Sequence, residues 1–453
     1  MSRTLVIGAG KSGVASANFL ARRGASVVLA DANANPSLPF TLDERVVRAF
    51  GTEDEGLLDG VELIVISPGV PMTIPLLQRA NALALPVIGE IELAYRYLKG
   101  TVIAITGSNG KSTTTALIGE ILKIAGRRPI VAGNIGNPLI AAIDFEQPRT
   151  YVLELSSFQL EAVESFHANV ALLLNITPDH MDRYPNFAAY AAAKHRIFRN
   201  QDARDAAILN ASVTDGRWQM ADGEPLTAPS AIRHPPSVGR VLRFSANERV
   251  EEGAWLDGEE MVLCVGGEER RIPRASLKLQ GNANVENALA SWLAARTVGV
   301  NDVDMQIAFG TFTGLPHRMV LVRELDGVRW INDSKGTNVD ATLKSLEGFA
   351  PSSVILILGG KDKAGEFERM RELVQSKTRA VLTIGKAADR ISDALEGAAA
   401  IVPAHDMQRA VDWARANAKS GEVVLLSPAC ASFDQYRNFE HRGEHFEELV
   451  RAL

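Results

Sequence analysis

The chain has 453 residues, of which 46% are hydrophobic and 23% charged, and its formal net charge is −6 at pH 7. This length exceeds one ordinary hydrophobic core, so we expect about two to four domains. The acidic balance argues against nucleic acid as the main partner, and no apolar run approaches the ~18 residues of a membrane-spanning helix. Two distant cysteines, Cys264 and Cys430, favour buried, reduced thiols, and no signal peptide is readable, so we expect a cytoplasmic protein.

The first 97 residues alternate short apolar runs, typical of strands, with helical stretches. Residues 6–13, VIGAGKSG, fit the G-x-G-x-x-G pattern directly behind an apolar run, and Asp31 ends the next run, SVVLAD. Glycines allow a tight turn and close approach of a phosphate, and an acid at this spacing suits a ribose. The pattern predicts a nucleotide site on a parallel sheet and, taken alone, leaves an NAD-dependent oxidoreductase open.

A second glycine loop, TGSNGKST at residues 106–113, stands between the apolar run TVIAIT and a helical stretch, residues 111–125. It matches the shortened pattern G-x-x-G-K-[ST], because Ile105 stands where a full P-loop has glycine. Backbone N–H groups at a helix N-terminus hold phosphate oxygens, Lys111 adds positive charge, and Ser112 can ligate Mg²⁺. Two nucleotide loops in one chain favour a phosphorylated nucleotide substrate plus ATP over NAD.

The next strand-like runs end in polar residues. Glu154 lies in the apolar run TYVLEL, where a lone charge is costly to bury unless it is paired or metal-bound; an edge strand facing water is the alternative. Asp179, His180 and Asp182 follow the run NVALLLNI and suit either a divalent metal or a solvated turn. Residues 211–276 alternate short runs with Gly, Pro and charge, which predicts peripheral hairpins without assignable chemistry.

From about residue 315, after a helix predicted over 282–299, a third β–α alternation begins. Strands are expected at 328–332, 353–360, 380–385, 399–404 and 422–428, and helices at 407–419 and 438–453. Three polar loops, INDSKGTNVDAT, LGGKDKAGEF and SPACASFDQYRNFEHRG, follow strands of this region. Because the carboxyl ends of parallel strands meet at one edge of a sheet, these loops predict a ligand site.

Several strings occur in one order along nearly the whole chain: AITGSNGKST, GNIG, LELSSFQLE, NITPDHMDRY, AAKHRIF, LPHR, NDSKGTN and LLSPACASFDQYRNFEHRG. In this order they resemble the Mur ligases, most of all the members that add D-glutamate to UDP-N-acetylmuramoyl-L-alanine. The Asp-Asn-Pro-Arg string typical of the diaminopimelate-adding members is absent. The resemblance implies an α/β chain of three domains: a Rossmann-like UDP-substrate domain (1–97), a central P-loop-type ATPase domain with a mostly parallel sheet (98–314), and a C-terminal Rossmann-like domain that binds the incoming amino acid (315–453).

The resemblance also implies three sets of binding residues. The UDP-substrate would contact Gly10, Lys11, Ser12, Asp31, Ser67, Asn134 and His180. ATP would contact Gly107, Ser108, Asn109, Gly110, Lys111, Ser112, Thr113, Asn284, Asn287, Arg318, Asp333 and Lys335. D-Glutamate would contact Thr337, Lys363, Ser432 and Phe439, with Lys361 as the alternative to Lys363.

The implied cofactors are ATP and two Mg²⁺ ions. Ser112 and Glu154 would bind the first ion, and His180 with a carbamylated Lys194 would hold the second, supported by Asp179. Without the resemblance, Lys194 in AAYAAAKHRIF would be interpreted as a solvated helical lysine. The implied catalytic residues, of which Arg318 and Lys335 would reach the γ-phosphate, are Lys111, His180, Lys194, Arg318 and Lys335.

The implied reaction is ATP-dependent amide formation through an acyl phosphate and a tetrahedral intermediate, in which positioning and charge neutralisation dominate catalysis. The expected partners are small-molecule substrates, without nucleic acid or membrane, and we expect a monomer. Three other functions stay open at this point: an NAD-dependent oxidoreductase, a P-loop NTPase acting as a regulatory module, and another amino-acid ligase of the same superfamily, including folylpolyglutamate synthases.

Overall fold

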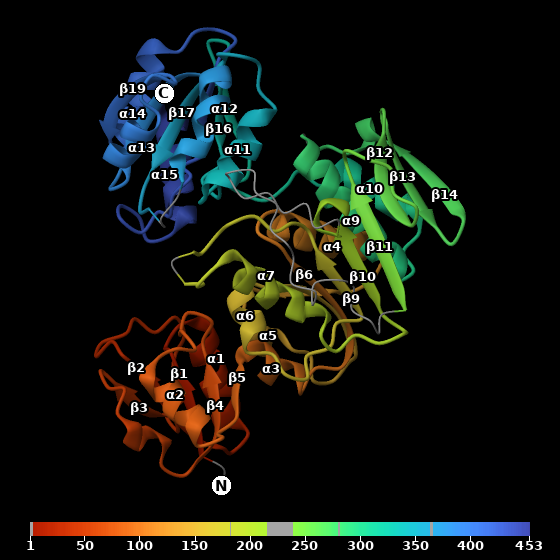
Figure 1. The fold of residues 1–453 in the computed structure, drawn as a ribbon, viewed down its shortest axis with the longest axis vertical. Coiled ribbons are helices and arrows are strands. Elements are labelled where there is room, and N and C mark those ends of the chain that lie inside the picture. The colour runs from red at the N-terminus through yellow and green to blue at the C-terminus, as the bar shows by residue number, and fades with distance from the viewer. Residues whose placement is uncertain (1–2, 182, 215–238, 280, 363–365) are drawn as a thin grey trace. The chain divides into compact units, whose positions relative to one another are not determined.

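The computed structural model describes residues 3–181, 183–214, 239–279, 281–362 and 366–453. They form three mainly parallel sheets (Figure 1). The described residues divide into two compact units: one extends to Phe312 without residues 177–185, and the other contains residues 177–185 and the chain from Thr313 on. No helix among the described residues combines the length and apolar character needed to cross a membrane. The expected domain limits, 97/98 and 314/315, stay predictions.

The first sheet has five parallel strands in the order β3-β2-β1-β4-β5. Its elements are β1 (Arg3–Ile7), α1 (Lys11–Arg22), β2 (Ser26–Asp31), β3 (Val47–Phe50), β4 (Val61–Ile66), α2 (Pro75–Ala82), β5 (Val87–Gly89) and α3 (Glu90–Tyr95). The predicted nucleotide loop joins β1 to α1. A Cβ on Gly13 would lie 1.8 Å from the Gly8 carbonyl oxygen, so the helix can start this close to the strand because residue 13 is glycine.

The second sheet has nine strands in the order β14-β13-β12-β11-β10-β9-β6-β8-β7. Its strands are β6 (Gly100–Thr106), β7 (Ile130–Gly133), β8 (Arg149–Glu154), β9 (Val170–Leu173), β10 (Ala206–Asn210), β11 (Arg240–Ser245), β12 (Gly253–Asp257), β13 (Glu260–Val265) and β14 (Glu268–Pro273). Its helices are α4 (Lys111–Ile124), α5 (Leu139–Ala142), α6 (Ser157–Glu161), α7 (Phe187–His195), α8 (Ala211–Thr214), α9 (Asn282–Thr297) and α10 (Asp302–Thr311). Helices α4, α9 and α10 share one hydrophobic core with strands of this sheet.

Residues 211–276 differ in part from the prediction of peripheral hairpins. The pairs β12–β13 and β13–β14 are antiparallel hairpins at the sheet edge, as predicted. Strand β11, however, pairs in parallel with both β10 and β12, so this region extends the central sheet. The physical reason is burial, because Leu242 and Phe244 of β11 join the core that contains α9.

The third sheet has six strands in the order β15-β16-β20-β17-β18-β19, of which only the edge strand β15 is antiparallel. Its strands are β15 (Val320–Leu325), β16 (Val328–Asn332), β17 (Val354–Gly359), β18 (Thr378–Ile384), β19 (Ala400–His405) and β20 (Val423–Leu426). Its helices are α11 (Val339–Glu347), α12 (Arg371–Lys377), α13 (Ala388–Ala394), α14 (Met407–Asn417) and α15 (Phe439–Ala452). Two separate cores, one with α11, α12 and α13 and one with α14 and α15, cover its two faces, as a doubly wound sheet requires.

Candidate functional site

The loop between β6 and α4 has the geometry of a phosphate cradle. Gly110 adopts a left-handed conformation (φ +83°) just before α4 begins. A Cβ at this position would also lie 2.4 Å from Oδ1 of Asn287, so both conformation and space require glycine. The N–H groups of the first turn of α4 follow directly, and N–H groups at a helix start can bind phosphate oxygens.

Asn175, which the sequence analysis did not select, clamps this loop. Its carbonyl oxygen accepts the Ser108 N–H (3.0 Å), and its side-chain oxygen accepts the Asn109 N–H (2.8 Å). Its Nδ2 donates back to the Asn109 carbonyl oxygen (3.0 Å). Strand β9 ends at Leu173, earlier than residue 176 where the strand was expected to end, and this early end brings Asn175 against the loop. The phosphate loop is therefore held in shape by the segment after β9.

Two lysines share one backbone oxygen of the loop. Lys111 Nζ donates to the carbonyl oxygens of Gly107 (2.8 Å) and Ser108 (2.9 Å), and Lys194 Nζ donates to the same Gly107 oxygen (2.8 Å). Their ammonium groups therefore lie close together and, as like charges, repel each other. Two ammonium groups at this loop suit an anionic ligand such as a phosphate.

The alternative interpretation of Lys194 as a solvated lysine is wrong, because the residue is only 2% exposed. Its ammonium lies 4.6 Å from the ring centroid of Tyr190, and the Tyr190 hydroxyl is 3.0 Å from Ser108 Oγ. Helix α7 therefore brings a buried cation and a phenol to the phosphate loop. Burying a cation this deeply is costly unless its charge has a use or a partner.

Glu154 is the last residue of β8 and is 1% exposed. The edge-strand alternative is wrong, because β8 lies between β6 and β7 and residue 154 pairs with Ile105, close to the start of the phosphate loop. Asn134 Nδ2 donates to Glu154 Oε1 (2.8 Å), whereas Oε2 is buried without a hydrogen-bond partner in the part of the chain that the structure describes. With the buried Ser112 at the start of α4, this carboxylate supplies the oxygen donors that Mg²⁺ prefers.

The start of α9 packs against the same loop. Asn287 is 7% exposed, and its Oδ1 accepts a hydrogen bond from Thr114 Oγ1 of α4 (3.2 Å). Its Nδ2 donates to Asn284 Oδ1 (3.2 Å). The structure thus brings Asn284 and Asn287 beside the nucleotide loop, and their contact with adenine stays a prediction.

In the first sheet, Asp31 and Ser67 hold the first glycine loop. The Asp31 carboxylate accepts the Ala9 N–H (2.7 Å) and the Asn33 N–H (2.9 Å), and Ser67 Oγ donates to the Gly8 carbonyl oxygen (2.8 Å). The remaining predicted residues, Gly10, Lys11 and Ser12, lie at the start of α1, where a phosphate is expected.

In the second unit, Asp333 stands at a junction of four segments and is 5% exposed. Its Oδ2 accepts hydrogen bonds from Ser345 Oγ and Ser427 Oγ, both at 2.7 Å, and its Oδ1 accepts the Met319 N–H (3.3 Å). Burial raises the pKa of Asp333 to about 6, and the two hydroxyl donors and the charge of Arg318 oppose this rise. The charge of Arg318 acts on Asp333, so the structure brings these two predicted residues together. The contact of Asp333 with the ribose stays a prediction.

Residues predicted to bind the amino acid lie in the loops after β16 and β20, and a pocket formed by them stays a prediction. Lys335 Nζ lies 3.8 Å from the centroid of the Phe439 ring, a cation–π distance. Ser432 is 2% exposed and Thr337 is half-buried. Lys363 lies outside the described residues, and Lys361 exchanges two backbone hydrogen bonds with Ala431, so the choice between the two lysines stays open.

Arg442 of α15, which the sequence analysis missed, connects the loops of Ser334 and Cys430 through buried hydrogen bonds. It is 1% exposed and donates to the carbonyl oxygens of Ser334 (2.8 Å) and Cys430 (3.1 Å) and to Ser334 Oγ (3.0 Å). Burial lowers the pKa of Arg442 to about 10. A charged arginine within FEHRG, directly after a site loop, was the available signal.

The Asp179–His180 turn also belongs to the second unit. The Asp179 carboxylate accepts the His180 N–H (2.9 Å) and the Asn338 Nδ2–H (3.1 Å). His180 adopts φ +60°, and its ring is about one-third exposed, at 31%. Asp182 lies outside the described residues. The turn therefore presents an imidazole to solvent beside a fixed carboxylate.

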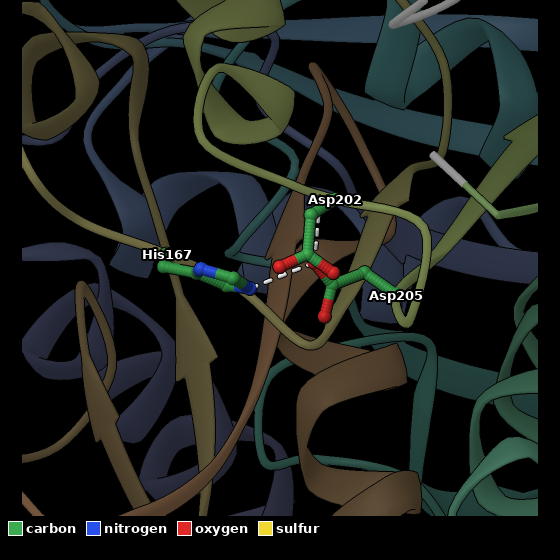
Figure 2. A group of neighbouring side chains, drawn as sticks. All are labelled: His167, Asp202 and Asp205. Atoms are coloured by element: carbon green, nitrogen blue, oxygen red, sulfur yellow. Dashed lines mark hydrogen bonds and ion pairs between the residues drawn. The ribbon is translucent and has the colours of Figure 1, made fainter. Parts of the chain in front are cut away.

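Another group of metal-type side chains, His167, Asp202 and Asp205, lies away from these loops (Figure 2). His167 Nε2 is 2.7 Å from Asp205 Oδ2, which also accepts the Asp202 N–H (2.6 Å). Arg204 donates to both carboxylate oxygens of Asp202 (3.1 and 2.6 Å). The group precedes β9 and β10, at the strand ends opposite the phosphate loop, and its carboxylates contact Arg204 and His167 within the protein.

Comparisons with known proteins identify the family of this chain. Three family models match the chain: the Mur ligase MurD-like N-terminal domain at residues 2–89, the Mur ligase middle domain at 105–295, and the Mur ligase glutamate ligase domain at 317–430. The UDP-N-acetylmuramoylalanine--D-glutamate ligase of Koribacter versatilis is 44% identical, with 100% of this chain and 97% of the relative covered. The enzyme of that name from Acidobacterium capsulatum is 43% identical, with 99% and 96% covered.

Among solved structures, the pseudomurein peptide ligase type C of Methanothermus fervidus has a TM-score of 0.60 at 17% identity, with 100% of both chains covered. The UDP-N-acetylmuramate-alanine ligase of Thermotoga maritima has a TM-score of 0.59 at 19% identity, with 100% of this chain and 99% of the other covered. At this level of identity, the two structures support the fold.

Proposed function

The chain belongs to the Mur ligase family, and from this premise we propose that it joins D-glutamate to UDP-N-acetylmuramoyl-L-alanine with ATP. Members of the family use ATP and Mg²⁺. The observation that carries the substrate assignment is that full-length relatives at 39–44% identity bear the name of this D-glutamate ligase. The buried phosphate loop with two cations on the Gly107 oxygen supports the use of ATP.

The proposed chemistry has two steps. A carboxylate is a poor electrophile, so one of its oxygens first takes the γ-phosphoryl group of ATP, giving an acyl phosphate and ADP. The amine of D-glutamate then attacks the acyl carbon, and phosphate leaves from the tetrahedral intermediate as the amine loses a proton. No side chain has to form a covalent bond, so the residues act by positioning and by neutralising charge.

We propose that Lys111 and the N–H groups of residues 107–113 hold the ATP phosphates. Ser112 and Glu154 would hold a Mg²⁺ ion, which neutralises phosphate charge when bound. The buried Glu154 oxygen without a hydrogen-bond partner in the described chain supports this role. Asn284 and Asn287 would lie on the adenine side, and Asp333 would bind the ribose.

We also propose a second Mg²⁺ ion. It would be held by His180 and by Lys194 in its carbamate form. Reaction of the neutral amine with CO₂ gives the carbamate and releases one proton, which converts a cation into an anion with two oxygen donors. The support is that Lys194 is buried beside the ammonium of Lys111, where a positive charge is unfavourable.

For the other substrates, the proposal follows the expected residues. Arg318 and Lys335 would neutralise the γ-phosphate. Thr337, Lys363, Ser432 and Phe439 would bind D-glutamate, and the loops around Gly10–Ser12, Asp31, Ser67, Asn134 and His180 would bind the UDP-substrate. The enzyme would act as a monomer on small molecules.

Phosphate release in an omission series tests the proposal. ATP, Mg²⁺, UDP-N-acetylmuramoyl-L-alanine and D-glutamate together should release phosphate, and omission of any one should reduce the rate to background. L-Glutamate, diaminopimelate and folate substrates serve as matched alternatives. Hydrolysis that is independent of the amino acid would favour the regulatory NTPase, and a preference for another acceptor would identify a different ligase.

A further inference from the structure

Glu447 of α15 reaches the loop that carries Arg318 through two buried side chains. Glu447 Oε1 accepts a hydrogen bond from Asn332 Nδ2 (2.8 Å), and its Oε2 pairs with Arg451 one turn later (2.6 Å). Its side chain is 15% exposed, and its Oε1 also lies 3.4 Å from His317 Nδ1. The carboxylate is therefore largely buried and held between a cation and an amide.

The Asn332 amide connects Glu447 to His317. Asn332 is 0% exposed, and its Nδ2 lies 2.8 Å from His317 Nδ1. Its Oδ1 accepts the Ser334 N–H (3.0 Å), which fixes which end of the amide carries the hydrogens. His317 immediately precedes Arg318, and its carbonyl oxygen accepts the Lys335 N–H (3.0 Å). The network thus ends on the main chain of both proposed γ-phosphate cations.

The amide nitrogen has three polar neighbours for its two hydrogens. Its N–H groups face Glu447 Oε1 and the Gly443 carbonyl oxygen (3.1 Å), and also His317 Nδ1, which accepts or donates according to the ring tautomer. A charged acceptor forms a stronger hydrogen bond than a neutral one, so the carboxylate determines the direction of one hydrogen. The Glu447 charge thereby limits how the amide and the His317 ring share the other hydrogen.

There is little room for the ring to rearrange. A Cβ on Gly443 would lie 2.3 Å from His317 Nδ1, so α15 touches the imidazole directly. His317 itself is 7% exposed and has a left-handed backbone (φ +60°), a conformation that surrounding contacts must hold. If the Glu447 contact is lost, the turn that carries His317 and Arg318 therefore shifts, because the ring has no room to move on its own.

We propose that Glu447 is a positioning residue for the nucleotide. Through Asn332 and His317 it fixes the turn that presents Arg318 and the main chain of Lys335. The inference rests on the proposed function, in which these two cations neutralise the γ-phosphate. Glu447 itself has no contact with substrate in this role.

The test compares Glu447→Ala and Glu447→Gln with Glu448→Ala, the exposed neighbour on the same helix. Loss of one hydrogen bond to a charged group corresponds to about a tenfold to hundredfold change. We expect Glu447→Ala to raise KM for ATP by that factor, with KM for D-glutamate and the UDP-substrate within about twofold. Glu447→Gln, which keeps an acceptor oxygen, should lie between wild type and alanine, and Glu448→Ala should match wild type.

Thermal unfolding and wild-type turnover distinguish a failure of the positioning role from a failure of the proposed function. Equal rises in all three KM values, or a lowered unfolding temperature with an unchanged KM for ATP, would show that Glu447 merely anchors the helix and would overturn the inference. If the wild-type enzyme does not ligate D-glutamate, the proposed function fails. If it does ligate and Glu447→Ala keeps the wild-type KM for ATP, the positioning role alone fails.

Discussion

Glu90 provides a stability test with a defined sign. It begins α3, is 1% exposed, and its Oε1 accepts the Ile140 N–H at the start of α5 (2.7 Å). Its Oε2 is buried without a hydrogen-bond partner among the described residues. Burial raises the pKa of Glu90 from 4.5 to about 7, opposed by the backbone hydrogen bonds of Ile140 and Leu139.

The sign follows from proton binding in the two states. Between pH 4.5 and 7 the folded protein keeps this proton and the unfolded chain releases it, so the free energy of unfolding falls as pH rises. Each pH unit of difference is worth about 1.4 kcal/mol. The destabilisation by Glu90 is therefore near zero below pH 4.5 and reaches about 3 kcal/mol above pH 7.

Glu90→Gln replaces the carboxyl by a neutral group of the same shape and places N–H groups where Oε2 lies. Urea unfolding of wild type and variant should show a stability gain that is about 2 to 3 kcal/mol larger at pH 8 than at pH 5. Gains that are equal at the two pH values, or a loss at pH 8, would refute the reasoning.

Glu92, two residues further along α3, is the matched control of opposite sign. Burial acts to raise its pKa, but hydrogen bonds from Ser165, Glu164 and Arg96 lower it overall. Stability from such a carboxylate is present above the ordinary pKa and is lost as pH falls. Glu92→Gln should therefore destabilise the protein about equally at pH 8 and pH 5, and less as the pH falls below 4.5.

Three further predictions concern the proposed site. Lys194→Ala should lose most activity, and acetate should restore part of it; labelled CO₂ should give a carbamate carbon signal in wild type that the variant lacks, and an unmodified amine in the active Mg²⁺-bound enzyme would contradict this. Glu154→Gln should raise the Mg²⁺ concentration for half-maximal rate by at least about tenfold, measured by phosphate release, and an unchanged requirement would remove this residue from the ion site. Lys363→Ala should raise KM for D-glutamate far more than KM for ATP, with Lys361→Ala as the control; the reversed pattern would assign the role to Lys361.

The positions of the two glycine loops could be predicted from sequence, because each loop combines an apolar strand, a glycine turn and the start of a helix. Strand β6, the loop with Gly110, and helix α4 appear within one or two residues of the expected limits. These features are local, since strand burial and the left-handed glycine depend on neighbouring residues. The order of strands in the third sheet, with β15 at its edge, was not predictable in this way, because β15 has partly exposed side chains and pairs through long-range contacts.

Residues that act through burial were the ones that sequence reasoning could not find. Asn175 looks like an ordinary loop residue, and its importance appears only when β9 brings it to the phosphate loop. The place of Arg442 in FEHRG, directly after a site loop, was a signal for the residue, but nothing in its spacing indicates that three of its contacts are buried. Lys194 was assigned by resemblance alone; its burial depends on how α7 packs, which the alanine-rich sequence does not specify.

The most direct test of the central claim follows the oxygen atoms of the reaction. UDP-N-acetylmuramoyl-L-alanine labelled with ¹⁸O in the alanine carboxylate is incubated with ATP, Mg²⁺ and D-glutamate, and the released phosphate is analysed by mass spectrometry. Ligation through an acyl phosphate predicts one ¹⁸O atom in each phosphate formed and the D-glutamyl product in equal amount. Phosphate without ¹⁸O, formed by attack of water on ATP, would contradict the account.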